Sequence, residues 1–345
     1  MTNQHEITKR MPLLNREGNL TEPGWARGLL WDYHRPDIRA SGMRIKEWDY
    51  YFVSNGHIGL ALTIADNGYM GLDSVSYLDF DEKWEITKSP MRLLPMGKTA
   101  LPETSAAGSS EIARGGYALA FYHDDDGIRK LTFHMDKFRG KDAIEGMISL
   151  SDEPAESMVI ATPFEKSGHF YYNQKINCMR AAGWIELGGA RVELEPETWF
   201  AVLDWGRGVW TYHNTWYWGS ASGELDGVPF GWNIGYGFGD TSAASENVLF
   251  YGGKIHKLSQ VRFEIPMQDG EENYLAPWRF SSDDGRFEMA FTPILNRAAY
   301  TSVGVIKSDQ NQVFGRFTGT AALDDGTVLQ VNDFFGFAEK VENKW

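Results

Sequence analysis

The chain has 345 residues, of which 42% are hydrophobic and 23% charged, so it can bury a large core and its length fits two domains better than one. Its 33 basic and 47 acidic residues give a formal net charge of −14, the wrong sign for binding a phosphate backbone, and nucleic acid is excluded as an expected partner. The lone cysteine, Cys178, excludes an internal disulfide framework. Neither a leader nor a membrane-spanning stretch is expected, and we predict a cytoplasmic protein.

Residues 1–30 are expected to form an extension that packs across the surface. Beyond them, short runs alternate apolar and polar residues, which is typical of half-buried strands: TFHM at Thr132, ARVEL from Ala190, QVRFEI from Gln260 and RFEMAF from Arg286. Turn-forming clusters separate the runs, such as DDDG at 124–127 and SSDDG at 281–285. Long segments with helical periodicity are absent, so the pattern predicts antiparallel sheet with few short helices.

Three landmarks recur in the same order in the two halves of the chain, which indicates an internal duplication. HIGLALTIAD at 57–66 is similar to NIGYGFGD at 233–240, and each precedes an apolar strand. DDGIRKLTF at 125–133 is similar to DDGRFEMAF at 283–291. IEGMISLS around Gly146 matches VFGRFTGT around Gly315. A repeat of this size suits a strongly bent sheet.

Bent antiparallel sheets avoid exposed edges by closing into barrels, so we predict an all-β protein of two tandem antiparallel β-barrel domains. The expected boundaries are an extension at 1–30, a first domain at 31–195 and a second domain at 196–345, with a hinge near Glu195-Pro196-Glu197.

The sequence motifs that resemble known cofactor-binding motifs are incomplete. Gly97-Lys98-Thr99 lacks the earlier glycine of a phosphate loop, and Gly235, Gly237 and Gly239 follow a strand-like run with no helix behind it. The eight histidines show no metal-ligand spacing. We therefore expect no metal, nucleotide or covalent cofactor.

Residues 204–219 are unusually rich in aromatic and ionisable side chains, with four tryptophans and two tyrosines beside Asp204, Arg207 and His213. One interpretation is a core strand in which Asp204 and Arg207 form an internal ion pair. The other is the wall of a pocket, in which rings pack on a substrate while Asp204, His213 or Tyr212 transfers a proton at a pKa shifted by the low dielectric. The residues leave both open.

A second ring-rich run, HFYYNQKIN at 169–177, has the same ambiguity. Alternation places Tyr171, Asn173 and Lys175 on one face of a strand, either as a binding surface or as solvated groups at a sheet edge.

Four segments carry a resemblance to a known family along nearly the whole chain: GNLTEPGWAR from Gly18, RIKEWDYY from Arg44 with LTIAD from Leu62, FYYNQKIN from Phe170 and DWGRGVW from Asp204. They resemble the domain-of-unknown-function family 2804. That family is remotely similar to the AttH and carotenoid 1,2-hydratase group, whose members have two lipocalin-like domains and include hydratases, tocopherol cyclases and cofactor-free pericyclases. The resemblance implies two lipocalin-like barrels. The Asp-His-x-Trp-type motif of the hydratase branch lacks its His here, because Trp205 follows Asp204.

Three functions remain open. The first is a cofactor-independent lyase, hydratase, isomerase or cyclase acting on a hydrophobic, isoprenoid- or lipid-like molecule. The second is a non-catalytic carrier of such a ligand, and the third is a carbohydrate-active enzyme using carboxylates such as Asp204 and Glu224. The sequence leaves the oligomeric state open. The candidate catalytic residues are Asp204, His213, Arg207 and Tyr212, and the candidate substrate-binding residues are Trp205, Trp210, Asn214, Trp216, Trp218, Trp232, Tyr171, Asn173 and Lys175.

Overall fold

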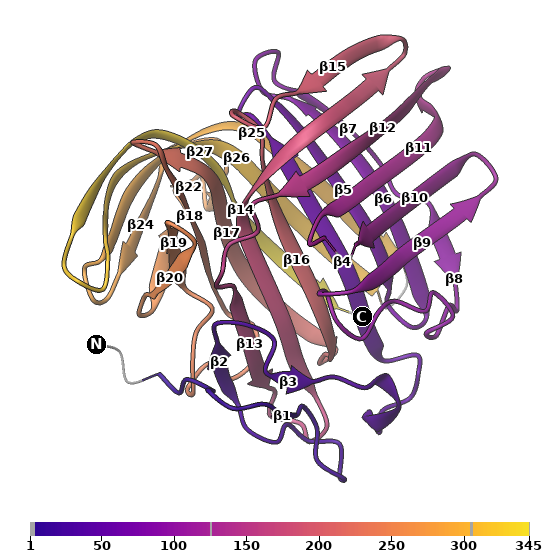
Figure 1. Cartoon of the computed structure of the whole chain (residues 1–345), viewed down its shortest axis with the longest axis vertical. Helices are drawn as coiled ribbons and strands as arrows, with labels where there is room; N and C mark the ends of the chain where they lie inside the picture. Colours follow the sequence, from indigo (N-terminus) through magenta and orange to yellow (C-terminus); the bar gives the residue numbers. More distant parts are fainter. Residues whose placement is uncertain (1–3, 125, 304–305, 345) are drawn as a thin grey trace.

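The computed structural model describes residues 4–124, 126–303 and 306–344, and shows a nearly all-β protein of two curled antiparallel sheets (Figure 1). Within these ranges a single 3-10 turn, η1 (Arg35–Asp37), is the only helical segment. None of the described residues forms a helix that could cross a membrane. The predicted all-β class and paired lipocalin-like architecture are therefore confirmed.

The first sheet follows the path β7-β6-β5-β4-β16-β14-β12-β11-β10-β9. Three further strands pair with this path at its sides, namely β8, β13 and β15. The strand bounds are β4 (Ile45–Ser54), β5 (Ile58–Asp66), β6 (Met70–Asp79), β7 (Trp84–Lys88), β8 (Met91–Leu93), β9 (Gly108–Arg114), β10 (Tyr117–His123), β11 (Arg129–Arg139), β12 (Asp142–Ser151), β13 (Met158–Pro163), β14 (Phe170–Leu187), β15 (Ala190–Leu194) and β16 (Phe200–Val209).

The second sheet follows the path β20-β19-β18-β17-β27-β26-β25-β24-β21. Two short strands, β22 (Met267–Gln268) and β23 (Glu271–Glu272), pair separately. The bounds of the main strands are β17 (His213–Leu225), β18 (Val228–Tyr236), β19 (Val248–Tyr251), β20 (Lys254–Lys257), β21 (Val261–Glu264), β24 (Trp278–Ser282), β25 (Phe287–Val303), β26 (Ile306–Ala322) and β27 (Val328–Lys344).

The amino-terminal segment lies across the first sheet at the lower part of Figure 1. β1 (Met11–Pro12) pairs in parallel with β3 (Trp31–Asp32), and β2 (Gly24–Ala26) pairs with β13. The extension expected at residues 1–30 thus contributes strand pairing as well as cover, since β2 adds to the first sheet.

The two sheets share a strand order apart from β16, which lies between β4 and β14 in the first path and has no counterpart between β17 and β27 in the second. With that exception, the recurring landmarks occupy corresponding strands. β4 to β7 run consecutively toward one end of the first path, as β17 to β20 do in the second. Ile58 begins β5, and Ile234 lies in β18, its counterpart. The two Asp-Gly turns precede β11 and β25, and the third landmark pair lies in β12 and β26.

The chain passes from the first sheet to the second at a later residue than the sequence predicts. Residues 200–209, which the boundary at residue 196 assigns to the second domain, form β16 and pair with β4 and β14 of the first sheet. The second sheet starts only at His213. The boundary near 196 is therefore wrong, because the Glu195-Pro196-Glu197 turn joins two strands of the same sheet.

Side chains from both sheets interlock where the sheets meet. Phe314 from the second sheet is fully buried, with its ring centroid 5.1 Å from that of Phe52 and 5.2 Å from that of Phe80. Asn177 reaches from β14 to the second sheet and donates from its amide to the Ser220 hydroxyl and to the carbonyls of Ala221 and Trp232. Truncating a ring of this kind to Ala typically costs about 3–5 kcal/mol, so the interface is part of the core.

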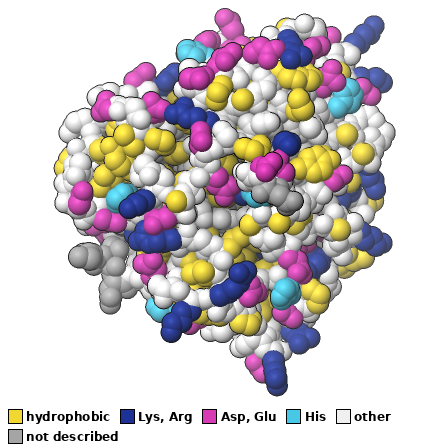
Figure 2. All heavy atoms as spheres, in the orientation of Figure 1, with side chains coloured by type: hydrophobic (Ala, Val, Ile, Leu, Met, Phe, Trp, Pro, Cys, Tyr) yellow, Lys and Arg dark blue, Asp and Glu magenta, His cyan; other side chains and the backbone are white. Residues whose placement is uncertain are grey.

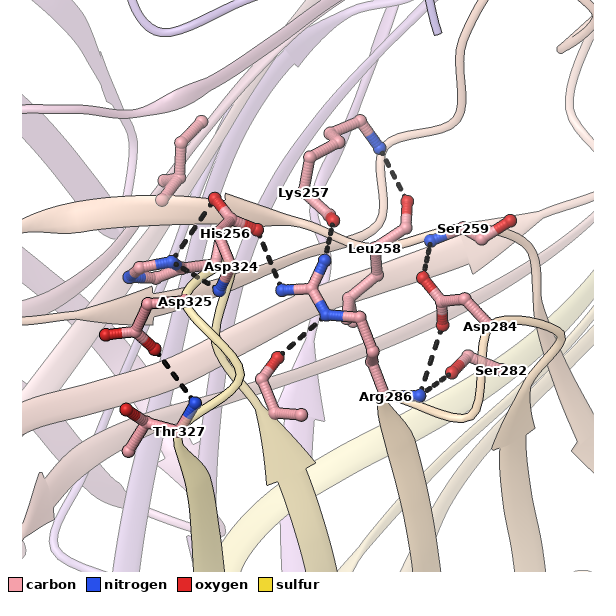
Figure 3. A network of polar contacts seen from close by, with 12 residues as sticks. His256, Lys257, Leu258, Ser259, Ser282, Asp284, Arg286, Asp324, Asp325 and Thr327 are labelled. Atoms are coloured by element: carbon pink, nitrogen blue, oxygen red, sulfur yellow. Dashed lines mark hydrogen bonds and ion pairs between the residues drawn. The ribbon is translucent and has the colours of Figure 1, made fainter. Parts of the chain in front are cut away.

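A polar network fixes one end of the second sheet (Figure 3). Arg286, just after the DDG turn, donates to the carbonyl of Lys257, to the carbonyl of Ala322 and to the Asp324 carboxylate. Asp284 accepts from the backbone N–H of Ser259. The turn residues that the sequence marks as hairpin signals therefore also tie three neighbouring connections together.

The face drawn in Figure 2 carries interspersed acidic and basic side chains, with acidic groups gathered along its upper edge. This distribution on that face is consistent with the acidic net charge of the chain.

Candidate functional site

A cavity of about 290 Å³ lies between the two sheets. The first sheet contributes residues of β4 to β7, β14 and β16, and the second contributes residues of β17 and β25 to β27. One group of lining residues is aromatic and the other is polar or charged. The aromatic group is Trp48, Tyr50, Tyr171, Trp210, Trp216, Trp218 and Phe238, and the ionisable side chains outside it are Glu85, Lys175, Asp204, Glu246, Arg297 and Glu339.

The aromatic wall is a continuous set of ring contacts. Trp210 lies edge-on to Trp48 at 5.2 Å, to Trp216 at 5.8 Å and to Phe238 at 4.9 Å between ring centroids. Trp48 stacks on Tyr171 at 6.2 Å. Such edge-to-face packing holds the rings in fixed orientations, so the wall is preformed.

The absence of a side chain at Gly206 leaves room for the Trp48 ring. Trp48 is the register partner of Gly206, and a Cβ at residue 206 would lie 1.9 Å from Cζ2 of that ring. Only a residue without a side chain permits this approach. The glycine of DWGRGVW is thus a packing requirement of the aromatic wall.

Strand register gathers a row of polar groups on the first sheet. Asp204 of β16 is paired directly with Lys175 of β14 on one side and with Tyr50 of β4 on the other. Directly opposed residues share a face of the sheet, and all three line the cavity. Lys175 Nζ lies 2.9 Å from Asp204 Oδ1 and 3.9 Å from the ring centroid of Trp218. Asn173 donates to the same Asp204 oxygen at 2.6 Å.

A second row lies on the other sheet and also lines the cavity. Glu339 of β27 is paired with Trp218 of β17 and with Gln312 of β26, and Gln312 is paired with Arg297 of β25. Glu339 accepts from Trp216 Nε1 at 2.7 Å and from Gln312 Nε2 at 3.1 Å. The two sheets therefore present one row of functional groups each to the same cavity.

Burial raises the pKa of the Glu339 carboxyl to about 7. Hydrogen bonding from Trp216 and the nearby charges of Arg297 and Lys175 limit that rise. Glu339 is partly buried and lines the cavity. The pKa of Glu246 is also raised by burial. Burial thus shifts the pKa of two carboxyl groups in this cavity upward.

The cavity brings together about half of the sequence-predicted site residues. Asn173 lies behind the wall as a partner of Asp204. Six candidates line the cavity itself: Asp204, Lys175, Tyr171, Trp210, Trp216 and Trp218.

The other candidates lie elsewhere. Trp205 is buried in the core of the first domain and Trp232 in that of the second. Tyr212 is 46% exposed, and His213 is exposed at the start of β17. Asn214 is buried and donates to the Thr211 carbonyl. None of these five residues lines the cavity between the sheets.

The ion pair of Asp204 with Arg207, one of the two interpretations of residues 204–219, does not form. Their odd spacing in an extended strand puts them on opposite faces. Arg207 is fully buried on the far side, where it pairs with Asp49 at 3.0 Å and lies 3.8 Å from Glu47. The structure instead gives Asp204 the partner Lys175. Glu224, the suggested companion of Asp204 for sugar chemistry, lines a separate cavity and pairs with Arg180.

Sequence reasoning missed the polar and charged residues that the second half of the chain contributes to the cavity. Glu339, Gln312 and Arg297 lie on long amphipathic strands where single polar residues attract no notice, and Glu246 lies in a connection. Tyr50 and Trp48 belong to the RIKEWDYY run, which contributes to the family resemblance but is not among the predicted site residues. Strand pairing is the signal that could have found all of these except Glu246, because each of the others is paired with another cavity residue.

Within the described ranges, no group of three or more His, Cys, Asp or Glu side chains has an arrangement that could hold a metal ion.

Comparison with solved structures shows the fold. An AttH candidate from Nitrosomonas europaea is similar with a TM-score of 0.53 and 13% identity, over 86% of this chain and 92% of that one. Kievitone hydratase from Nectria haematococca gives a TM-score of 0.48 and 8% identity, over 97% of this chain and 98% of that one. No curated protein matches the sequence. The model of the family described as domain of unknown function DUF2804 matches residues 4–345, so the chain belongs to that family, as its motifs predict.

Proposed function

We propose that the protein is an acid–base enzyme that works without a cofactor, as a lyase, hydratase, isomerase or cyclase, on a hydrophobic small molecule bound between its two sheets. The observation that carries this proposal is Glu339, whose carboxyl has a pKa of about 7 inside a cavity with an aromatic wall. A group with a pKa near the working pH can both donate a proton and take one back.

Glu339 has the contacts of a general acid. Its two oxygens are held by the Trp216 indole and the Gln312 amide, which fix the carboxyl against the cavity. Protonation of a double bond, or of a hydroxyl that then leaves as water, places positive charge on a substrate carbon. Water then adds to that carbon, or a neighbouring carbon loses a proton, and the Glu339 carboxylate takes back the proton that is released. Each outcome returns the acid to its starting state.

The polar row on the first sheet supplies the negative charge of Asp204, and the aromatic wall supplies π faces. Asp204 is fixed by Lys175 and Asn173, so its position in the cavity is set before a substrate binds. Indole faces attract cations by about 0.5–2 kcal/mol each. Trp210 and Trp216 border the same space, and this arrangement favours a cationic transition state over a neutral one.

Native mass spectrometry of gently purified protein tests the first part of this proposal. We expect a co-purified small molecule with a largely apolar body. Replacing Trp210 with Ala should remove it, because that ring contacts three others of the wall. Protein that retains no organic molecule, and binds none from a hydrophobic extract, would contradict a cavity ligand.

Turnover of that molecule tests the chemistry. Glu339→Gln keeps the size of the side chain but removes the proton, and the rate should fall by about 10²-fold or more. The control is Glu264→Gln, an exposed carboxylate on β21, which should leave the rate unchanged. A ligand that is released chemically unchanged, and that both variants bind like the parent, would identify a carrier instead.

A further inference from the structure

Arg297 stands out among the ionisable residues of the cavity because no carboxylate is its partner. It lies on β25, is partly buried and lines the space between the sheets. Among the described residues it donates to the Ser76 hydroxyl at 2.8 Å, and its guanidinium carbon lies 6.0 Å from the Phe314 ring centroid. A guanidinium has five N–H donors, so the hydroxyls of Ser76 and Tyr50 still leave N–H groups without a protein acceptor.

The other charged groups of the cavity already have partners, and Glu85 accepts from the Thr87 hydroxyl at 2.8 Å. Lys175 is paired with Asp204. The oxygens of Glu339 accept from Trp216 and Gln312, and Glu246 accepts from Asn233 at 3.2 Å. Although Glu339 lies near enough to Arg297 for their charges to interact, the two form no ion pair in the described structure. Arg297 is therefore the cation with capacity for a further anion.

Tyr50 adds a second donor at the same place. Its hydroxyl is buried, lines the cavity and lies close to Arg297 and Gln312, but it has no well-formed hydrogen bond. A buried hydroxyl without a partner costs free energy, which a ligand that accepts its hydrogen bond would recover. Burial also raises the pKa of Tyr50, so the phenol keeps its proton and remains a donor.

We propose that the substrate is an amphipathic anion, whose carboxylate binds between the Arg297 guanidinium and the Tyr50 hydroxyl while its apolar body lies on the tryptophan wall. The inference rests on the proposed function, since it names the substrate class of that same cavity. Arg297 and Tyr50 come from different sheets, β25 and β4, so a bound carboxylate would bridge the two domains. Planar guanidinium groups recognise carboxylates in this way with two parallel hydrogen bonds.

The inference also predicts how the substrate is oriented in the cavity. Arg297, Gln312 and Glu339 are successive positions of one cross-strand row. A carboxylate on Arg297 therefore places the atoms next to it beside the Glu339 carboxyl, and the more distant apolar part beside Trp216, Trp210 and Trp48. The reacting carbon atoms then lie beside Glu339 and Trp216, between the anionic end and the apolar body of the molecule.

Binding of two matched probes tests this assignment. The probes are 2-naphthylacetate and its neutral analogue 2-(2-naphthyl)acetamide, and their dissociation constants are measured by tryptophan fluorescence and calorimetry. For the parent protein we expect the acid to bind about 10-fold tighter than the amide or more, as a charge-assisted hydrogen bond predicts. In Arg297→Gln this ratio should fall to about one, with the affinity for the amide unchanged.

Three further variants keep the test decisive. Arg279→Gln removes an exposed arginine of β24 and should retain the full ratio. If Arg297→Gln proves too unstable to measure, Tyr50→Phe and Arg297→Lys replace it, and each should lower the ratio without abolishing binding of the amide.

The outcomes separate the inference from the proposed function. Equal affinity of the two probes for the parent, or a preference for the acid that survives every variant at residues 297 and 50, overturns the anionic substrate while leaving an apolar binding cavity. Failure of both probes to bind, together with retention of no organic molecule by the purified protein, overturns both.

Discussion

Lys175 and Asp204 occupy directly paired positions on β14 and β16, and their side chains meet in a 2.9 Å ion pair on the wall of the cavity. Both are buried, with 3% and 8% of their surface exposed. An ion pair in such a place has lost most of its hydration, and its stability depends on both partners being present.

Asp204→Asn should therefore destabilise the protein. The change leaves the Lys175 ammonium buried without its counter-charge, at a cost of about 3–5 kcal/mol. The double variant Asp204→Asn, Lys175→Met should recover much of this loss, because it removes the unpaired charge as well. Thermal and urea melts measure both. Adding Arg207→Gln to Asp204→Asn should give an additive loss, since Arg207 belongs to the separate Asp49 and Glu47 cluster; restoration of stability by Arg207→Gln would contradict the assigned pairing.

Gly206→Ala should disturb the aromatic wall. The new methyl group would overlap the Trp48 ring, which must then move away from Tyr171 and Trp210. We expect a stability loss of about 1–3 kcal/mol, a change in near-ultraviolet circular dichroism and at least partial loss of naphthyl-probe binding. Gly227→Ala provides a contrast, since nothing lies within 4 Å of a Cβ there, although its positive φ of 80° adds local strain. A Gly206→Ala protein that binds probes like the parent would show that Trp48 does not shape the site.

Cys178 should react only when the two sheets separate. It is 3% exposed, and a Cβ on Gly231 of the second sheet would lie 2.9 Å from its sulfur. Burial raises the pKa of its thiol to about 12, so little thiolate forms at neutral pH. Alkylation by iodoacetamide, followed by mass spectrometry in increasing urea, should track the unfolding transition. Rapid labelling under native conditions would mean that the sheets open independently of global unfolding.

The free energy of unfolding should depend on pH through Glu339. Its folded pKa of about 7 lies above the ordinary value of 4.5, so the unfolded chain releases this proton first. Stability from this group is complete below about pH 4.5 and is lost as the pH rises toward 7. Relative to Glu339→Gln, the parent should lose about 1–3 kcal/mol across that window. The difference between the two proteins is needed because burial also lowers the pKa values of Lys46 and Lys257 to about 7. A constant difference across the window would contradict the raised pKa.

The sequence predicts the fold well because local patterns determine it. Alternation marks strands such as β11 and β25, and Asp-Gly turns mark the hairpins before them. The boundary at residue 196 fails for a long-range reason: β16 has the same alternation whichever sheet accepts it, and only pairing with β4 decides.

For a related reason, only about half of the candidate site could be predicted from the sequence. Trp210, Trp216 and Trp218 gather in one segment, so their density is visible in the sequence. Arg297 and Glu339 lie far from that segment and reach the cavity only through the register of β25 to β27. His213 and Tyr212 are adjacent to the tryptophans, but they occupy the strand start at the surface. Clustering along the sequence therefore identifies the aromatic wall, but it does not identify Glu339 on the opposite sheet.

The carboxyl titration of Glu339 tests the central claim most directly. Protein labelled with ¹³C at the glutamate side-chain carboxyl is titrated by NMR, and the Glu339 resonance is identified by its loss in Glu339→Gln. A midpoint near pH 7 that falls when Trp210→Ala admits water to the wall is the predicted result, because burial is the cause of the shift. A midpoint near 4.5 in the parent protein would mean that Glu339 is ionised at neutral pH, and would contradict its role as the acid of this cavity.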